Sequence, residues 1–265
     1  MSRPGLDTPA NKPIRNSGAP SAGALKDPEP DALPRHIAVI MDGNGRWARQ
    51  QGKPRIEGHR AGAKAVRAIV TECARLDLDA LTLYSFSMEN WKRPAAEIGF
   101  LMDLYVRYLM SERSEMIKNN VRFVQIGRRE PLPEHVLDEL DRTVQMTAGN
   151  SGLTLVLALN YGSRTEIADA AAAIAADVKA GKLDPEQVDE ALFGRYLYTA
   201  DLPDPDLLIR TAGEMRISNY LLWQISYAEL YVSDVCWPDF DVHQLHEACA
   251  AYTLRQRKFG AVRDL

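Results

Sequence analysis

The strongest constraint on the fold is an alternation along the chain between short apolar runs and longer segments with a helical repeat. The short runs are nearly continuous in apolar, β-prone residues and cover residues 37–41, 80–86, 121–126, 153–159, 207–209 and 230–232. The helical segments cover residues 59–76, 94–118, 134–147, 164–179 and 242–257. Strands this short and this apolar are typical of a parallel sheet whose two faces are covered by helices. The alternation therefore predicts an α/β fold with crossover helices.

The N-terminal segment, residues 1–33, differs in composition from the rest of the chain. It is rich in Pro, Ala, Gly and Ser and contains no aromatic residue. Such a segment cannot bury enough apolar surface to offset the entropy lost on ordering, so we expect a disordered tail. The chain has 265 residues, of which 46% are hydrophobic, so residues 34–265 suffice for one domain with a sizeable core.

Charge and cysteine content narrow the function. The 32 Lys and Arg residues against 36 Asp and Glu give a net charge of -4, which removes the electrostatic reason to expect a nucleic-acid partner. Three cysteines without a Cys-x-x-Cys pair, and no segment resembling a secretory leader, predict a cytoplasmic protein. The most apolar stretches fall short of the ~20 apolar residues that span a bilayer. We therefore expect any membrane association to occur from outside.

A first polar cluster follows the first predicted strand. It contains Asp42, Gly43, Asn44, Gly45, Arg46 and Trp47. Ligands of open parallel sheets bind beyond the carboxyl ends of the strands, where glycines let backbone N–H groups approach a phosphate. A Gly-x-Gly turn alone fits an ordinary tight connection equally well, but the flanking Asp42 and Arg46 favour a diphosphate site. Asp42 would hold Mg²⁺, which takes one or two carboxylates together with phosphate oxygens, and Arg46 would bind the same phosphates.

Basic residues and a second polar cluster lie farther along the chain. Arg55, His59 and Arg60 begin a predicted helix and, taken alone, fit a solvated face better than a site. After the second strand come Ser87, Met88, Glu89, Asn90, Trp91 and Arg93. Among these, the aromatic Trp91, like Phe86 before it, is by itself better explained by core packing.

The third cluster follows the run at residues 207–209. It contains Arg210, Arg216, Ile217 and Ser218 around a glycine, which again describes a phosphate site. Glu229 stands just ahead of the last strand, and alone it would be a surface or capping carboxylate. His243 and His246 are three residues apart but have no Cys or further His nearby, so they are expected to be surface residues rather than zinc ligands.

The helix predicted at residues 94–118 is apolar on more than one face. Such a helix is normally buried, but one face could instead line a hydrophobic cavity. Together with three anion-binding clusters, this second interpretation points to a substrate with a diphosphate head and a long hydrocarbon tail. The small or polar residues Ala63 and Ser85 would leave such a cavity unobstructed, and its floor is expected to be built partly by Leu101, Tyr105, Leu109 and the run at residues 153–159.

Three motifs in this order resemble the signatures of undecaprenyl diphosphate synthases, the cis-prenyltransferase family. They are Met-Asp-Gly-Asn-Gly-Arg-Trp-Ala at residues 41–48, Phe-Ser-Met-Glu-Asn-Trp-Lys-Arg-Pro at 86–94, and Ile-Arg-Thr-Ala-Gly-Glu-Met-Arg-Ile-Ser-Asn at 209–219. The likeness runs from about residue 34 to residue 260. It implies a homodimer, a catalytic domain over residues 34–265 with a six-stranded, largely parallel sheet, and a hydrophobic tunnel for the growing chain.

The resemblance also implies roles for individual residues. Asp42 would be the essential Mg²⁺ ligand, Glu229 a second metal-binding carboxylate, and Asn90 a participant in proton loss. The allylic diphosphate would lie among residues 43–47, Arg55 and His59. Residues 87–93 would bring the two substrates together, and Arg210, Arg216, Ile217 and Ser218 would hold isopentenyl diphosphate.

The third motif departs from a common family form, Gly-Gly-Glu-His-Arg, at Ala212 and Met215. Where His occupies the position of Met215 it can assist the metal site, whereas a thioether is a poor ligand for Mg²⁺. No metal role is expected for Met215. The ending at residues 255–260 also resembles the C-terminal segment of the family, which would complete the site or the dimer interface.

The implied reaction is the Mg²⁺-dependent condensation of isopentenyl diphosphate with an allylic diphosphate, farnesyl diphosphate being the expected primer. The product would be a long-chain cis-polyprenyl diphosphate such as undecaprenyl diphosphate, the lipid carrier precursor for cell-wall synthesis, released through peripheral membrane contact. Three alternatives remain: a non-catalytic accessory subunit, a short-chain cis-prenyltransferase, and a phosphate-binding regulatory module. The presence of Asp42, Arg46, Arg210, Arg216 and Ser218 argues against the first.

Overall fold

The computed structural model of the protein describes residues 33–255. The predicted tail, residues 1–33, lies outside the described residues except for Leu33, whose side chain is buried in the core. Most of the C-terminal segment expected at residues 255–260 likewise lies outside them.

A six-stranded sheet forms the centre of the molecule, with the spatial order β3-β4-β2-β1-β5-β6 and every pairing parallel. The strands are β1 His36–Ile40, β2 Ala80–Ser87, β3 Arg122–Ile126, β4 Thr154–Tyr161, β5 Leu207–Arg210 and β6 Glu229–Val232. All six predicted strands are confirmed, with ends that differ by at most two residues. The chain leaves β1 toward β2 and β4 on one side and later places β5 and β6 on the other. The strand order therefore reverses at β1, where ligands of such sheets bind.

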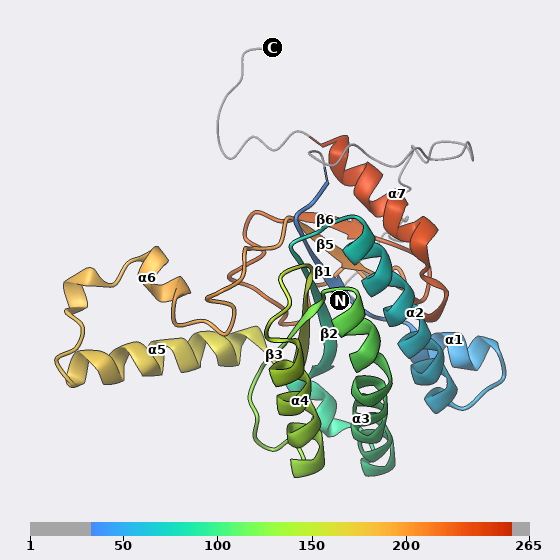
Figure 1. The fold of residues 1–265 in the computed structure, drawn as a ribbon, viewed down its shortest axis with the longest axis horizontal. Helices are drawn as coiled ribbons and strands as arrows, with labels where there is room; N and C mark the ends of the chain where they lie inside the picture. The colour runs from blue at the N-terminus through green and yellow to red at the C-terminus, as the bar shows by residue number, and fades with distance from the viewer. Residues whose placement is uncertain (1–32, 256–265) are drawn as a thin grey trace, which may run out of the picture.

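The helices lie mainly on one face of the sheet (Figure 1). They are α1 Asn44–Gln50, α2 Arg55–Arg75, α3 Ala95–Lys118, α4 Glu134–Thr147, α5 Ser163–Lys179, α6 Glu190–Gly194 and α7 Val242–Thr253. The larger core cluster joins α2, α3, α4 and α7 to one set of alternating strand residues, such as Ile37 and Val39. Figure 1 shows α5 and α6 extending away from the sheet.

The expectation that helices cover both faces is wrong for the second face. There Ala38 and Ile40 pack against Tyr220, Leu221 and other residues of the largely irregular segment before β6. Three tyrosines make this cover compact, since the rings of Tyr84 and Tyr220 stack at 4.3 Å and Tyr161 meets both edge-on. Aromatic rings bury a large area each, so an irregular segment can cover a sheet without a helix.

The short helix α1 was not predicted, because its seven residues open with the Asn-Gly pair of an apparent turn. It packs very closely on α2, since a Cβ atom at Gly58 would lie 1.9 Å from the carbonyl oxygen of Asn44. One turn later, a Cβ at Gly62 would lie 2.4 Å from the Asn44 side-chain oxygen. Only glycine fits at these two positions, and α2 therefore sets the position of the polar turn after β1.

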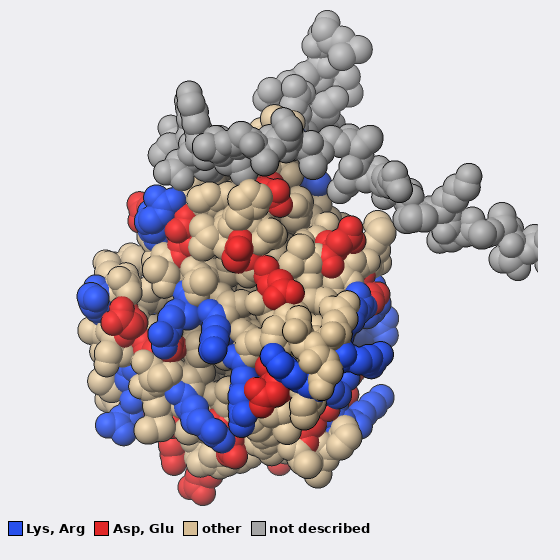
Figure 2. All heavy atoms as spheres, turned by 90° about the vertical axis from the view of Figure 1, so that its right-hand side faces the viewer, with Lys and Arg blue, Asp and Glu red and all other residues tan. Residues whose placement is uncertain are grey.

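Within residues 33–255, no helix is long and apolar enough to cross a membrane. The acidic net charge is not spread evenly over the molecule. Figure 2 shows basic side chains gathered across the middle of the face that carries α1 and α2, with acidic side chains above them.

Candidate active site

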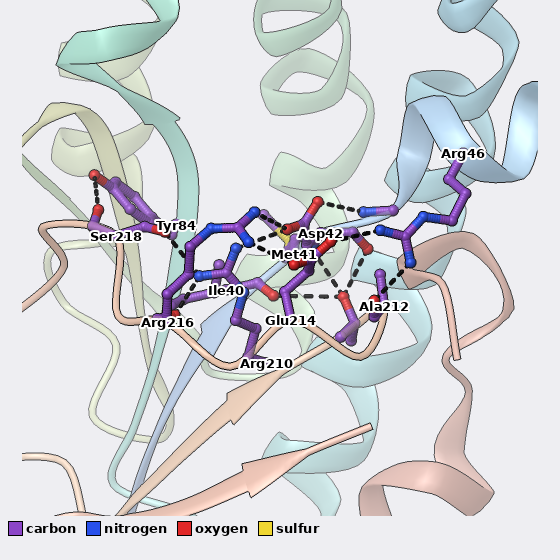
Figure 3. A network of polar contacts seen from close by, with 12 residues as sticks. Ile40, Met41, Asp42, Arg46, Tyr84, Arg210, Ala212, Glu214, Arg216 and Ser218 are labelled. Atoms are coloured by element: carbon purple, nitrogen blue, oxygen red, sulfur yellow. Dashed lines mark hydrogen bonds and ion pairs between the residues drawn. The ribbon is translucent and has the colours of Figure 1, made fainter. Parts of the chain in front are cut away.

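The carboxyl ends of β1 and β5 bring the first and third predicted clusters together (Figure 3). Ile40 and Arg210, the last residues of the two strands, are paired in the sheet register. Asp42 therefore lies beside the Arg210 side chain, which donates from Nη2 to Asp42 Oδ2 at 2.8 Å. Arg216 Nη2 lies 3.7 Å from the same oxygen.

Hydrogen bonds to the backbone also hold the Asp42 carboxylate and its turn in place. Its Oδ1 accepts the N–H of Gly43 at 2.7 Å. The hydroxyl of Thr211 donates to the Asp42 carbonyl at 2.7 Å and accepts the Asp42 N–H at 2.8 Å, which ties the turn to the end of β5. Charge-assisted bonds to a carboxylate are about twice as strong as neutral ones, so the side chain is well oriented before any ligand binds.

The turn itself depends on Gly43, whose φ of 100° is strained for any other residue. A Cβ atom there would also come within 2.9 Å of Ala212 Cβ and Cys236. The structure thus gives Gly43 a packing reason, because the chain after β1 has no room for a side chain at this point, while the approach of its N–H group to a phosphate stays a prediction.

Glu214 holds the arginines of the first and third clusters together, and the sequence reasoning missed it. Arg46 donates to Glu214 Oε1 and to the Ala212 carbonyl, each at 2.7 Å. Arg216 pairs with the other Glu214 oxygen. These hydrogen bonds, that of Arg216 foremost, lower the pKa of Glu214. Glu214 stands inside the third motif, two residues before Arg216, which was the available signal.

A second missed carboxylate, Glu97 of α3, contacts the remaining basic side chains. Its Oε1 lies 3.3 Å from Arg55, His59 and Arg93. Burial alone would raise the pKa of Glu97, but the hydrogen bond and charge of Arg55, with Arg93 and His59, bring it below its usual value. Burial lowers the pKa of His59, against the opposing hydrogen bond of Glu97, so the imidazole is neutral near pH 7.

Two adjoining pockets meet at this edge of the sheet. The smaller one, about 290 Å³, is almost entirely polar. It is lined by Met41, Asp42, Gly43, Asn44, Gly45, Arg46, Arg55, His59, Arg93, Glu214 and Arg216.

The larger cavity, about 580 Å³, shares Met41, Asp42, Asn44, His59 and Arg93 with it and continues between α2, α3 and the sheet. Its inner lining is mostly apolar and includes Ala63, Val66, Leu101, Leu104, Tyr105, Tyr108, Leu109, Leu157 and Trp237. The predicted lining positions Ala63, Ser85, Leu101, Tyr105 and Leu109 all face this cavity. Leu153 does not line it, because it precedes β4 at the opposite edge of the sheet.

The second cluster divides between the cavity and the core. Ser87, Glu89 and Asn90 line the cavity, with the N–H of Ser87 donating to Asn90 Oδ1 at 3.3 Å. Trp91 packs edge-on against buried Phe86, and its indole N–H donates to Asn160 at 2.8 Å. The core interpretation of Trp91 is the one that the structure supports.

Several other predicted residues lie outside both pockets. Met88 lies beside Gly162, and Trp47 donates its N–H to Asp239 at 2.7 Å while Lys53 lies over its ring. Ile217 packs against the core cluster on the other face of the sheet. Substrate contacts by Met88, Trp47, Trp91 and Ile217 therefore stay predictions without support from the cavity lining.

Glu229 is not brought to Asp42 within one chain. It opens β6 and is paired in register with Leu207, the first residue of β5, so it lies at the amino edge of the sheet. Its carboxylate instead accepts from Arg255 Nη1 at 2.7 Å. Metal binding by Glu229 stays a prediction that a single chain does not support, because Glu229 precedes its strand, whereas the residues that meet at Asp42 follow theirs.

The loop that carries Arg216 and Ser218 is conformationally strained. Ala212, Ser218, Asn219 and Leu221 all have positive φ angles between 46° and 66°. Such conformations are costly for residues other than glycine and cluster at functional sites. Asn219, also absent from the predicted site, links this loop to the second cluster by donating to Glu89 at 3.0 Å.

Buried polar atoms without a partner also occur at this place. Among the described residues three side-chain atoms are buried and make no hydrogen bond; Arg210 Nε and Asn44 Oδ1 lie at the site, and the third is Gln224 Oε1. Arg210 uses its other nitrogens on Asp42, Ser218 and the Arg216 carbonyl. A guanidinium left with a free donor beside a polar pocket fits an anionic ligand.

The donor set also fits a magnesium ion of the kind that nucleotide and diphosphate enzymes use. Residues 33–255 contain no group of three or more His, Cys, Asp or Glu side chains arranged to hold a metal. Mg²⁺ does not require one, because it commonly takes one or two carboxylates and completes its shell with phosphate oxygens and water. The partly exposed Asp42 carboxylate at the mouth of both pockets meets that requirement.

Comparison with known proteins identifies the family to which the chain is similar. Residues 40–260 match a family model described as "Putative undecaprenyl diphosphate synthase". An isoprenyl transferase of Geobacter sulfurreducens is 51% identical over 231 residues, 87% of this chain and 94% of that protein. A ditrans,polycis-undecaprenyl-diphosphate synthase of Vibrio cholerae, specific for (2E,6E)-farnesyl diphosphate, is 48% identical over 87% of this chain and 92% of its own length.

Among solved structures, lavandulyl diphosphate synthase from Lavandula x intermedia, in complex with dimethylallyl diphosphate, superimposes with a TM-score of 0.85. It is 37% identical, and the match covers 87% of this chain and 99% of that one. An α/β sheet with a cationic pocket opening into an apolar cavity is thus the architecture of a prenyl-diphosphate transferase. The chain belongs to the undecaprenyl diphosphate synthase family of cis-prenyltransferases and is a transferase of prenyl groups that extends cis-prenyl chains.

Proposed function

We propose that the protein condenses isopentenyl diphosphate with farnesyl diphosphate in a Mg²⁺-dependent reaction. The product is a long-chain cis-polyprenyl diphosphate such as undecaprenyl diphosphate, the lipid carrier precursor for cell-wall synthesis. The observation that carries this proposal is the junction of the two pockets at Asp42, Asn44, His59 and Arg93. A diphosphate head in the polar pocket would leave a hydrocarbon tail in the apolar cavity.

The arginines and His59 of the polar pocket contact carboxylates in the free protein. Arg46 and Arg216 share Glu214, while Arg55, His59 and Arg93 share Glu97. A diphosphate offers these donors a stronger anion, so binding exchanges partners on arginines that are already in position. Such preorganisation stabilises the negative charge that develops on the leaving diphosphate at little reorganisation cost.

The reaction breaks the bond between the allylic carbon and the diphosphate oxygen and forms a bond from that carbon to isopentenyl diphosphate. Asp42 would hold Mg²⁺, which neutralises charge on the departing diphosphate. Arg210, Arg216 and Ser218 form one hydrogen-bonded group at the end of β5, and we assign isopentenyl diphosphate to it. A proton is then lost to form the cis double bond.

We assign Asn90 a positioning role in this reaction. A neutral amide is a poor base, so it does not take the proton itself. Its oxygen receives the Ser87 N–H at 3.3 Å, which orients the amide at the cavity wall. There it places a diphosphate oxygen that accepts the proton.

The protein is further proposed to act as a cytoplasmic homodimer that meets the membrane peripherally when product is released. Strand β6 is a sheet edge with half-exposed Leu230, which supports pairing with a second subunit.

The test is an assay of the purified chain with farnesyl or geranyl diphosphate and labelled isopentenyl diphosphate, with Mg²⁺ and with excess chelator. We expect label in long products from farnesyl diphosphate with Mg²⁺ and none after chelation. No consumption of isopentenyl diphosphate with either primer would overturn the proposal.

A short-chain product is the second candidate, because the lavandulyl diphosphate synthase shares the fold at a TM-score of 0.85. Sizing the product distinguishes the two candidates. A product only one condensation longer than its primer would favour the short-chain reaction.

A further inference from the structure

The apolar stripe of α3 that lines the cavity is interrupted by a buried charge. Leu101, Tyr105 and Tyr108 follow one another at helical spacing along the cavity wall. The next position of the same stripe, one turn on, is Glu112, whose side chain is only 7% exposed. The stripe then resumes with buried Met116. A carboxylate therefore occupies the place at which the apolar lining would otherwise continue.

The partner of Glu112 comes from the opposite wall. On α2 the cavity is lined by His59, Ala63 and Val66, and Arg67 lies directly beyond them. Arg67 Nε donates to Glu112 Oε2 at 2.7 Å, and its Nη2 donates to Oε1. The planar guanidinium thus grips the carboxylate with two parallel bonds, a geometry with strong directional preference. We call this pair, Arg67 with Glu112, the clasp.

The clasp spans two helices whose facing sides form the cavity. Glu112 is buried between them while Arg67 is 61% exposed, so the guanidinium closes the gap from outside. Ser111 adds a hydrogen bond to Glu112 at 3.1 Å. Burying a carboxylate costs free energy, and an apolar pair of similar volume is often at least as stable. An ion pair, unlike an apolar contact, joins the two helices at one defined position, as the end of a cavity requires.

We propose that the clasp is the far boundary of the hydrocarbon cavity and that it sets how far the prenyl chain grows before release. This inference rests on the proposed chain-elongation function. As the tail lengthens, it reaches Tyr108, Leu109 and Val66, and further growth requires α2 and α3 to separate at the clasp. Each additional buried CH₂ favours elongation, and the strength of the clasp opposes it. Arg67 and Glu112 are therefore positioning residues that determine product length.

A second ion pair on α3 provides a matched control. Arg113, the next residue after Glu112, points about 100° away around the helix and pairs with Glu139 of α4, with Thr143 as a further partner. It is also mostly buried and also joins two helices, but it joins α3 to α4 rather than to α2, which forms the opposite wall of the cavity. A general loss of helix packing and a loss of the cavity boundary can therefore be separated.

The experiment measures product sizes from farnesyl diphosphate and labelled isopentenyl diphosphate for five variants. They are Glu112→Gln, Arg67→Glu, Glu112→Arg, the exchanged pair Arg67→Glu with Glu112→Arg, and the control Glu139→Gln. The three single clasp variants should shift the product maximum upward by about one or more five-carbon units, since the next buried stripe residue is roughly 6 Å farther along α3. The exchanged pair should return toward the wild-type distribution, and the control should keep it.

The rate of the first condensation and the melting temperature are measured alongside. Wild-type first-condensation rates with longer products support the clasp. Unchanged product lengths in Glu112→Gln and both charge reversals, with normal first condensation, would overturn it while leaving the proposed function intact. The same upward shift in Glu139→Gln, or no recovery in the exchanged pair, would also overturn it. Absence of any condensation in the wild-type chain would instead refute the proposed function.

Discussion

The amino and carboxyl edges of the sheet carry the same types of polar side chain, but these side chains make different interactions at the two edges. At the amino edge, the Asp206 carboxylate accepts the N–H groups of Arg35 and His36 at 2.9 and 3.1 Å. Arg35 pairs with Asp79 at 2.6 Å. The His36 ring is buried between the Pro203 carbonyl and the Thr82 hydroxyl, at 2.6 and 2.7 Å. Polar side chains at this edge complete the hydrogen bonding of strand ends.

At the carboxyl edge, two polar side chains keep hydrogen-bonding atoms that the rest of the protein does not use. The Asp42 carboxylate pairs with Arg210 and Arg216, Arg210 keeps a free Nε donor, and Asn44 keeps a free acceptor. Left-handed conformations occur at both edges, since Asp77 and Asn120 before β2 and β3 have positive φ angles like the residues of the loop after β5. The comparison teaches that unmade hydrogen bonds, rather than charge or strain as such, separate the functional edge from the structural one.

The sharpest break of this comparison is Asp42→Ala. We expect turnover to fall roughly 1000-fold or more, since a group acting on transition-state charge is lost. The variant should stay folded but lose about 1–3 kcal/mol of stability, because buried Arg210 then lacks its carboxylate partner. Steady-state turnover and urea unfolding measure the two effects, and near-normal Mg²⁺-dependent turnover in the folded variant would refute the assigned role.

Asp206→Ala is the matching variant at the amino edge. It removes the acceptor of two backbone N–H groups, which should cost about 1–3 kcal/mol of stability. Turnover per folded molecule should stay close to wild type. A large loss of turnover without destabilisation would erase the distinction between the edges.

Arg216→Ala tests the division of the carboxyl edge into two subsites. Loss of a charge-assisted contact of about 1.5–3 kcal/mol should raise the apparent KM for isopentenyl diphosphate roughly 10- to 100-fold. The KM for the allylic primer should rise much less, since Arg46, Arg55 and Arg93 remain. Kinetics with each substrate varied in turn give the answer, and equal effects on both would contradict the assignment.

The pH dependence of the free energy of unfolding tests the structural role of His36 at the amino edge. Burial lowers the pKa of His36 from its ordinary 6.5 to about 4, against the hydrogen bond that the ring makes to the Pro203 carbonyl. Because the folded pKa lies below the unfolded one, the stability that neutral His36 contributes is complete above about pH 6.5 and is lost as pH falls toward 4. Between pH 7 and pH 5 this loss should be about 2 kcal/mol.

The measurement is the difference in unfolding free energy between pH 7 and pH 5 for the wild type and for His36→Gln. The wild type should lose about 2 kcal/mol more than the variant over this interval. Identical pH dependence in the two proteins would show that His36 is not held neutral.

The smallest expected effect concerns the inner cavity. Ala63→Leu adds bulk to a lining position and should shorten the product distribution by a few five-carbon units while the first condensation continues. Leu153→Trp, at a buried position outside the lining, should instead lower stability by about 1–3 kcal/mol and leave product length alone. Product sizing and thermal unfolding separate the two, and a shorter product from Leu153→Trp would place the cavity floor elsewhere.

The strands and the three polar clusters could be predicted because each rests on a local signal. A continuous apolar run identifies a strand that is covered on both faces, and polar residues directly after it must lie at the carboxyl edge. The meeting of Asp42 with Arg210 follows from these two facts alone. The cover of the second face could not be predicted, because it depends on tyrosines that stack across long sequence separations.

The carboxylates Glu97 and Glu214 were missed for a related reason. Each was visible near predicted site residues, but only the fold shows that one carboxylate serves two or three basic side chains at once. Glu229 and Leu153 lie away from the site for a different reason. Both precede their strands, and the start of a parallel strand lies a strand length away from the edge that holds the site.

The close packing at Gly58 and Gly62 fixes one wall of the cavity. Helix α2 packs closely on α1 at these glycines, receives a hydrogen bond from Trp237 at the Gly62 carbonyl, and is joined to α7 through Glu72 and His246. It is therefore anchored along most of its length. Because α2 packs on the turn after β1 and also lines the cavity, the position of the diphosphate turn relative to the apolar wall is set before any substrate binds.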